Sequence, residues 1–304
     1  MWKVKVLIQF FLSHLPMGEK INYLLQNLKN SHSPEKMANR INDLSKSLKK
    51  LGEHVELEGS TVVEIGTGWE AIGTILLYLM GVKICHTYDH VPHLRFELVQ
   101  MLINEIENHI DEISQFISVP KPILDERLSK IKTSENLNDF FEKANIIYHA
   151  PGDAAETGLE SNSVDVVYSN AVLEHVPKEV VNNIIIESKR ILKNTGVAYH
   201  LIGLHDHYVS FDKKISKVNF LQYPEWLWAF FVYNKISYHN RLREKQFLTI
   251  FKSHGAKINW IESKIDEPDI DVLKKIKINK KFSGMTPEEL AVYRTEIIIS
   301  FPSA

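Results

Sequence analysis

The chain has 304 residues, 44% of them hydrophobic, which suits one large folded domain with insertions and argues against wholesale disorder. Its 36 Lys and Arg residues nearly balance its 38 Asp and Glu residues. The formal charge of −2 therefore gives no general attraction to nucleic acid or to an anionic membrane, and leaves only local patches. Cys85 is the sole cysteine and lies in an apolar run, so we expect a small buried side chain, no internal disulfide, no cysteine zinc cluster and a reducing, cytoplasmic setting.

The N-terminal segment 4–15 is apolar, with three polar interruptions. About 18–20 unbroken apolar residues are needed to span a bilayer, and the segment also lacks the small-residue cleavage site of a signal peptide. We expect a helix that packs on the domain. The alternative is a helix at a membrane interface, with Trp2, Phe10 and Phe11 among the lipid headgroups.

A second helix is predicted from Ser33, a good N-cap, and Pro34, which suits a first helical turn. Gly52 ends it. Apolar residues recur between these limits at helical spacing: Met37, Ile41, Leu44, Leu48 and Leu51. Residues 1–58 are therefore predicted to form a helical extension.

From residue 61 the chain alternates between short apolar strands and helices. This alternation predicts an α/β fold, a Rossmann-like and mostly parallel sheet of seven strands with helices on both faces. In such a sheet, ligands bind at the carboxyl ends of the strands. The expected strands are 61–65, 83–88, 145–149, 164–169, 197–202 (after a turn at 194–196), 257–261 and 295–301. The expected helices are 71–80, 94–116, 178–192 and 242–253, with a polar, mostly helical insertion at 120–137.

Residues 204–242 break this pattern, because they are rich in aromatic side chains. One interpretation is a pair of core helices, and the other is a lid over an active site. The aromatic residues are Tyr208, Phe211, Phe220, Tyr223, Trp226, Trp228, Phe230, Phe231, Tyr233 and Tyr238. We accordingly divide the main domain, 59–304, into a core (59–203), a lid (204–242) and a closing helix with strands (243–304).

The segment 62–69, VVEIGTGW, runs from a strand through a glycine turn into a helix. Glycines let the backbone approach a ligand, and the helix N-terminus offers free N–H groups to a carboxylate or phosphate. With Ala71 in the last place, the segment also fits a loose dinucleotide pattern, so an NAD-dependent oxidoreductase stays open at this point.

Acidic residues stand at matching places along the first three strands. Glu64 lies inside the first strand, Asp89 ends the second, and Asp153 follows the third in APGDA. After the fourth strand comes SVDVVYSNAVLEHV, residues 163–176. Over about residues 55–203, these segments together resemble the class I S-adenosylmethionine-dependent methyltransferase family. With the helical extension before the core and the aromatic segment after it, the overall pattern resembles bacterial members that act on small molecules and saccharides.

The resemblance implies S-adenosylmethionine as cofactor and assigns roles to particular residues. The turn Gly66, Thr67 and Gly68 would hold the methionine portion, and Glu64 would orient that turn or meet the amino group through water. Asp89 would hold the ribose. Asp153 with the backbone of Ala154 would meet the adenine, and Asn170 would lie beside the methionine portion. Glu70 stands where many members have a third glycine, and Asp165 we expect to be structural, because it begins its strand.

The candidate catalytic residues are histidines at ligand-facing strand ends: His175 after the fourth strand, and His205 and His207 after the fifth. Histidine accepts protons near neutral pH, so these residues suit deprotonation of a hydroxyl acceptor. With Glu174 they also suit a divalent metal that polarises the hydroxyl. Family members with such a metal carry a further acid where this chain has Ala171, so the metal is not favoured. His239 and Arg241 give a weaker signal of substrate contact.

These features predict a methyltransferase (a transferase) that methylates oxygen on a small molecule or saccharide, since aromatic faces stack well on rings. The alternatives are an NAD-dependent oxidoreductase, a metal-dependent RNA methyltransferase, which the near-neutral charge disfavours, and a non-catalytic adenosyl-binding protein. The expected partner is a small-molecule or glycan acceptor, with peripheral membrane contact through residues 1–15 as the minority interpretation.

Overall fold

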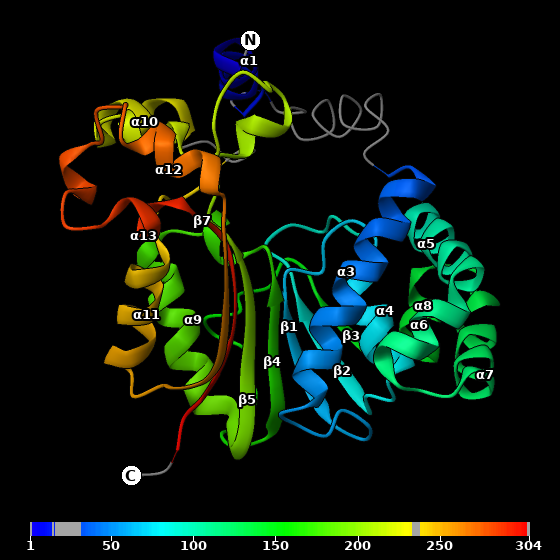
Figure 1. Ribbon diagram of the computed structural model, residues 1–304. Coiled ribbons are helices and arrows are strands. Elements are labelled where there is room, and N and C mark those ends of the chain that lie inside the picture. Colours follow the sequence, from blue (N-terminus) through cyan, green and yellow to red (C-terminus); the bar gives the residue numbers. More distant parts are fainter. Residues whose placement is uncertain (1, 14, 16–31, 233–237, 303–304) are drawn as a thin grey trace.

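The computed structural model describes residues 2–13, 15, 32–232 and 238–302, and these build a seven-stranded sheet (Figure 1). The strand order is β3-β2-β1-β4-β5-β7-β6. The strands are β1 (Thr61–Ile65), β2 (Ile84–Tyr88), β3 (Ile146–His149), β4 (Val164–Asn170), β5 (Leu192–Gly203), β6 (Lys257–Ile265) and β7 (Val292–Ser300). The first five pair in parallel, and β7 is antiparallel to both neighbours. The predicted Rossmann-like fold class is therefore confirmed.

Helices cover both faces of the sheet (Figure 1). On one face lie α3 (Pro34–Gly52), α4 (Ile72–Leu79), α5 (Phe96–Asn108), α6 (Ile110–Ile117), α7 (Lys121–Lys132) and α8 (Leu137–Lys143). On the other lie α9 (Lys178–Ile191) and α11 (Glu244–Ser253). The apolar stripe of α3 is buried in the same core as β1 and α4, so this helix of the predicted extension packs on the sheet as its periodicity requires.

A third group of elements, here called the cap, lies over the carboxyl ends of the parallel strands, at the top of Figure 1. It contains α1 (Trp2–Ser13), η2 (His207–Ser210), η3 (Asn219–Gln222), α10 (Glu225–Val232), α12 (Glu267–Leu273), η4 (Lys280–Phe282) and α13 (Pro287–Ala291). Its own apolar core joins α1 to the aromatic segment and to the residues that follow β6, including Trp2, Tyr208, Phe220, Trp228 and Phe282. No helix among the described residues is both long and apolar enough to cross a membrane.

Most predicted strands and helices lie within a few residues of the observed ones, and buried Cys85 is where its apolar run places it. The turn predicted at 194–196 is wrong. Those residues belong to β5, where the pairing jumps from Val164–Leu192 to Val166–Val197 and leaves an irregularity. Ser33 occupies the N-cap of α3, but its side chain makes no capping hydrogen bond. The helices α12 and α13 were not predicted, and residues 204–232 hold two 3₁₀ turns and one helix rather than a helix pair.

Candidate functional site

The glycine turn after β1 is closely packed against the segment that follows β4. Gly66 has a φ of 84°, and its N–H donates to the carbonyl of Tyr88 at 2.8 Å. A Cβ atom at this position would lie 2.4 Å from Cγ2 of Val172. Only glycine satisfies both the positive φ and this contact. The turn is therefore fixed between β2 and β4, at the point where the strand order reverses.

Glu64 is buried behind this turn, on β1. Its Oε2 accepts hydrogen bonds from the hydroxyl of Thr87 at 2.9 Å and from that of Thr74 on α4. Burial raises the pKa of Glu64 to about 7, against the effect of these two hydrogen bonds. The carboxyl group thus joins β1, β2 and α4, and it changes its charge near neutral pH.

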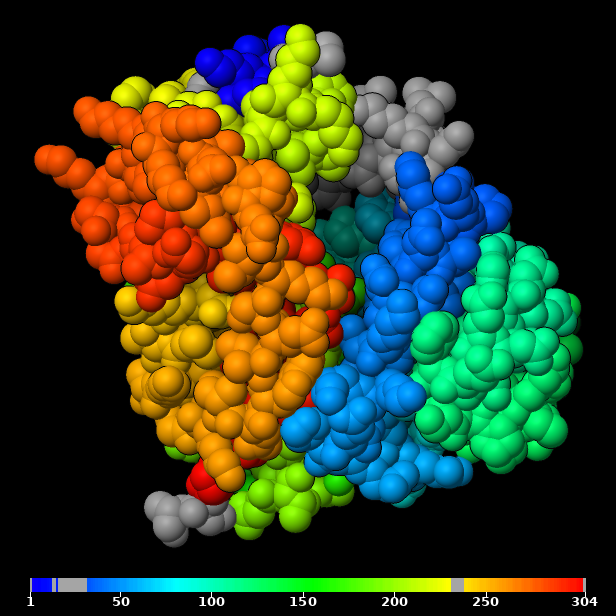
Figure 2. Space-filling model, viewed as in Figure 1, coloured from blue at the N-terminus to red at the C-terminus, as the bar shows by residue number. Residues whose placement is uncertain are grey.

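The first cavity, of about 460 Å³, opens beside the glycine turn. Figure 2 shows the surface hollowed between α3 and the orange-red C-terminal segment, below the cap. Five residues that the sequence assigned to the cofactor line this cavity: Glu64, Gly66, Thr67, Gly68 and Asn170.

Further residues of the first cavity were missed by the sequence analysis. Glu70 is buried, and its carboxylate meets Nδ1 of His32 at 2.8 Å and Nη2 of Arg40 at 2.7 Å. Arg294 enters from β7. In the sequence, only the replacement of a glycine by Glu70 hinted at a polar contact here. No local pattern relates residues 32 and 40 to a turn about thirty residues later in the chain.

The second cavity, of about 570 Å³, lies on the other side of Gly66, which lines both. Asp89, Asp153, Ala154 and His175 line it as well. Asp89 Oδ2 accepts from the N–H of Gly68 at 3.0 Å, and burial raises the pKa of Asp89. The exposed Asp153 accepts from the N–H of Ala155 at 2.8 Å. All eight residues assigned to the cofactor therefore line two cavities that meet at Gly66.

The three candidate histidines lie together but not equally near the second cavity. Only His175 lines it. The ring of His207 lies 4.9 Å from that of His175, and the ring of His205 lies 4.8 Å from that of His207. Neither His205 nor His207 lines the cavity. Buried His239 contacts His207, with Nε2 3.2 Å from Nδ1. Burial lowers the pKa values of His205, His207 and His239 and holds these rings neutral.

His175 is oriented by the end of the aromatic segment. Its Nδ1 lies 2.9 Å from the carbonyl oxygen of Tyr238, which can only accept, so the proton of the neutral ring sits on Nδ1. Nε2 is then the atom left with a lone pair. His175 is thus set up to accept a proton at Nε2.

Glu174, His175 and His207 form the group that could hold a divalent metal, because one ligand atom of each lies within 4.8 Å of the others. Glu174 is 1% exposed, its Oε1 accepts from the N–H of Gly203 at 3.0 Å, and its Oε2 has no hydrogen-bond partner. A carboxylate oxygen and two imidazoles suit zinc or manganese. Ala171 supplies no fourth ligand, as the sequence indicated.

Two other polar residues singled out in the sequence have structural contacts. Asp165 accepts from the N–H of Thr61 at 2.9 Å and pairs with Lys193 at 2.8 Å, as expected for a residue away from the ligand edge. Arg241 is buried and donates to the carbonyls of Phe220 and Tyr223. Arg241 therefore holds the cap together, and it lines neither of the two cavities.

Comparison with known proteins bears on the class of this fold. A family model described as "Methyltransferase domain" matches residues 125–200, which include Asp153, Asn170 and His175 but not the glycine turn. No curated protein matches the sequence.

The solved structures that are similar to this chain come from several organisms. A candidate S-adenosylmethionine-dependent methyltransferase from Listeria monocytogenes is 13% identical with a TM-score of 0.44, over 86% of this chain and 100% of that one. Geranyl diphosphate C-methyltransferase from Streptomyces coelicolor A3(2) is 10% identical with a TM-score of 0.45, over 89% and 84%. A Haloferax volcanii complex of the Trm112 methyltransferase activator with a candidate methyltransferase is 16% identical with a TM-score of 0.44. The match covers 86% of this chain and 96% of that one.

The family match and the seven-stranded Rossmann-like sheet support a methyltransferase of the S-adenosylmethionine-dependent class, with S-adenosylmethionine as its cofactor. The acceptor and the atom methylated are matters for proposal.

Proposed function

We propose that this protein transfers the methyl group of S-adenosylmethionine to a hydroxyl of a small molecule or saccharide, with His175 as the base. One observation carries the proposal: His175 lines the same cavity as Asp89 and Asp153, the two carboxylates assigned to the cofactor. A base in that position shares its space with the bound cofactor and with an incoming acceptor.

The two cavities divide the cofactor between them. The second cavity would take the adenosine, with the Asp89 carboxylate on the ribose hydroxyls and Asp153 with Ala154 at the adenine. The first cavity would take the methionine portion, beside Asn170 and the turn Gly66 to Gly68, where charges of both signs suit its ammonium and carboxylate groups. The sulfonium would then lie near Gly66, where the cavities meet.

The reaction needs few groups from the protein. S-adenosylmethionine would supply a methyl group activated by the positive charge on its sulfur, and the carbon–sulfur bond would break as the acceptor oxygen takes the methyl group, leaving a neutral thioether. The hydroxyl proton passes to Nε2 of His175. The protein positions the two reactants, and the sulfonium charge supplies the reactivity.

The acceptor class is supported by the aromatic residues around the second cavity. Tyr88 and Tyr238 line it, and the carbonyl of Tyr238 lies beside His175. Aromatic faces stack on sugar and other rings. We therefore propose a ring-bearing hydroxyl compound or a glycan as acceptor.

Calorimetric titration tests the cofactor first. The full chain should bind S-adenosylmethionine and its demethylated product and should not bind NAD. Binding of NAD alone would replace the proposal with hydride transfer. Binding of the adenosyl compounds without turnover across a panel of hydroxylated acceptors would favour a non-catalytic adenosyl-binding protein.

Glu64 makes cofactor binding depend on pH. The cofactor carries a net positive charge, which favours the ionised carboxylate, so binding should lower the pKa of Glu64 from about 7 and release a proton. Affinity should therefore rise as the pH is raised through 7 and level off above it. Titration in buffers of different ionisation enthalpy measures the released proton. Glu64→Gln should abolish this release, whereas Glu58→Gln, at an exposed ion pair with Arg127, should retain it.

A metal-assisted reaction is the second candidate, favoured by the unpartnered Oε2 of Glu174 beside His175 and His207. Burial raises the pKa of Glu174, and a neutral acid at this place needs no metal to balance its charge. We therefore expect methyl transfer to persist after dialysis against EDTA. Loss of turnover with EDTA, restored by Mn²⁺ or Zn²⁺, would instead make the metal part of the mechanism.

A further inference from the structure

The outer surface of the cap carries a broad apolar face, formed first by α1. One side of this helix is buried against the cap through Trp2, Val6 and Leu12. The opposite side is apolar too, and Phe11 is 66% exposed. Helices with apolar residues on both sides are normally buried on both sides, so the exposed apolar residues of α1 are a candidate interaction surface.

The neighbouring helix α10 extends this face. The rings of Phe10 and Phe230 stack at 5.4 Å between centroids, and Trp226 is 72% exposed. Isolated exposed apolar residues are common, but contiguous ones mark sites of interaction. The apolar surface consists of Val4, Leu7, Ile8, Phe11 and Leu15 with Trp226 and Phe230.

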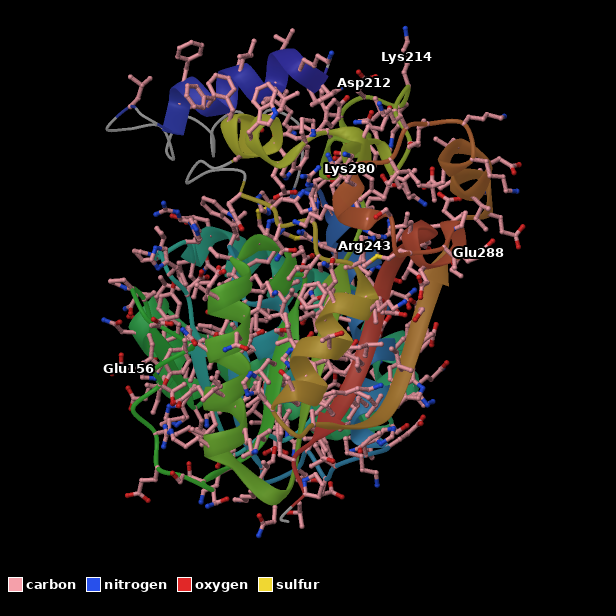
Figure 3. All side chains as sticks on the ribbon, turned by 90° about the vertical axis from the view of Figure 1, so that its left-hand side faces the viewer. Glu156, Asp212, Lys214, Arg243, Lys280 and Glu288 are labelled. Atoms are coloured by element: carbon pink, nitrogen blue, oxygen red, sulfur yellow. The ribbon has the colours of Figure 1, made fainter. Side chains whose placement is uncertain are left out.

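Among the described residues, the charges that border the apolar surface are mainly positive. Lys3 is exposed on α1, a helix without any Asp or Glu, and exposed Lys213 and Lys214 follow on the adjoining loop. Figure 3 shows α1 along the top of the molecule, with Lys214 projecting from the same end. The acids nearby are engaged: Asp212 accepts from the N–H of Trp2 at 3.1 Å, and Glu225 pairs with Arg241 and Lys281.

We propose that the apolar surface docks this protein on membranes that contain anionic phospholipids. Aromatic and aliphatic side chains would enter the headgroup region, and the lysines would lie against lipid phosphates. The net charge of −2 gives the chain as a whole no attraction to an anionic membrane. The lysines beside the apolar surface would therefore have to attract the lipid phosphates at short range. The exposed lysines of this border complement lipid phosphates, whereas the acids described nearby are already bonded within the protein.

Docking would also bear on the active site, and this part rests on the proposed function. The ring of Trp2 lies 5.7 Å from that of Tyr208 and 5.6 Å from that of Tyr223. Tyr208 follows His207 directly in the chain. A membrane that fixes α1 would therefore fix the cap above the second cavity, and an acceptor carried in the same membrane would meet the site.

Vesicle flotation with the full chain tests the docking. The protein should float with vesicles of phosphatidylcholine and phosphatidylglycerol, and much less with phosphatidylcholine alone. Phe11→Ser combined with Trp226→Ser should lower the partition coefficient at least about tenfold, because two large apolar side chains no longer insert. Lys213→Gln combined with Lys214→Gln should weaken binding and reduce its dependence on salt.

The matched control is Ile123→Ser combined with Ile186→Ser, since these side chains are 39% and 48% exposed outside the cap. This variant should bind vesicles as the unmodified chain does. Calorimetry with S-adenosylmethionine shows separately whether each variant is folded, so that loss of docking and failure of the proposed function are distinguished. Three outcomes would overturn the proposal: no flotation of the unmodified chain, equal loss in the control, or a dimer in sedimentation that Phe11→Ser disrupts.

Discussion

Replacement of Asp89 by alanine is expected to weaken binding of S-adenosylmethionine by more than tenfold. The variant would lack the pair of charge-assisted hydrogen bonds that the carboxylate is proposed to make with the ribose, worth about 1.5–3 kcal/mol. It would also lose the bond from the N–H of Gly68, which holds the glycine turn open toward both cavities. Calorimetric titration of the purified variant measures the loss directly.

Two further variants identify its cause. Asp89→Asn keeps an oxygen for Gly68 but no charge, so its affinity should lie between those of the alanine variant and the unmodified chain. Asp111→Ala removes an exposed carboxylate far from the cavities and should leave affinity unchanged. If Asp89→Ala binds as well as the unmodified chain, the assignment of Asp89 to the ribose is wrong.

Replacement of His175 by alanine is expected to lower the rate of methyl transfer by roughly 10²–10⁴-fold, the range for loss of a general base. Affinity for S-adenosylmethionine should change much less, because His175 meets the acceptor and not a charged group of the cofactor. Single-turnover formation of the demethylated product, with a hydroxylated acceptor, separates the chemical step from binding.

The pH profile distinguishes a base from a residue that only supports the fold. In His175→Gln the rate should lose its dependence on protonation of this ring, whereas a structural role would lower the rate equally at every pH. His109→Ala, at an ion pair with Glu105 far from the site, serves as the control. An unchanged rate in His175→Ala would move the role of base to another group of the cavity.

The amino-acid sequence determined the frame of this protein and the places of the acids that we assign to the cofactor. Each strand carries its own apolar run, and each acid stands at a fixed place relative to its strand end. Because parallel strands bring their carboxyl ends to one edge, local patterns were enough to bring Glu64, Asp89 and Asp153 to the same edge of the sheet. The sequence predicted seven strands in a mostly parallel sheet, whereas the antiparallel direction of β7 and its place between β5 and β6 were decided by the tertiary structure.

The tertiary structure alone decided which residues meet across long distances. Glu70 contacts His32 and Arg40 of the helical extension. Hydrophobic periodicity shows which face of a helix is buried, but it does not show which segment that face packs against. The order of the histidines, with His175 at the cavity and His207 behind it, depends on how the cap folds back over β4.

The same limit applies to α1. Its sequence showed a mainly apolar helix, but not which side would be covered, because its apolar residues lie on both sides of the helix. Packing of Trp2 against Tyr208 and Tyr223 buries one side and leaves Phe11 outside. Local composition thus determined which helices and strands form, and contacts between distant segments determined which of their surfaces remain exposed.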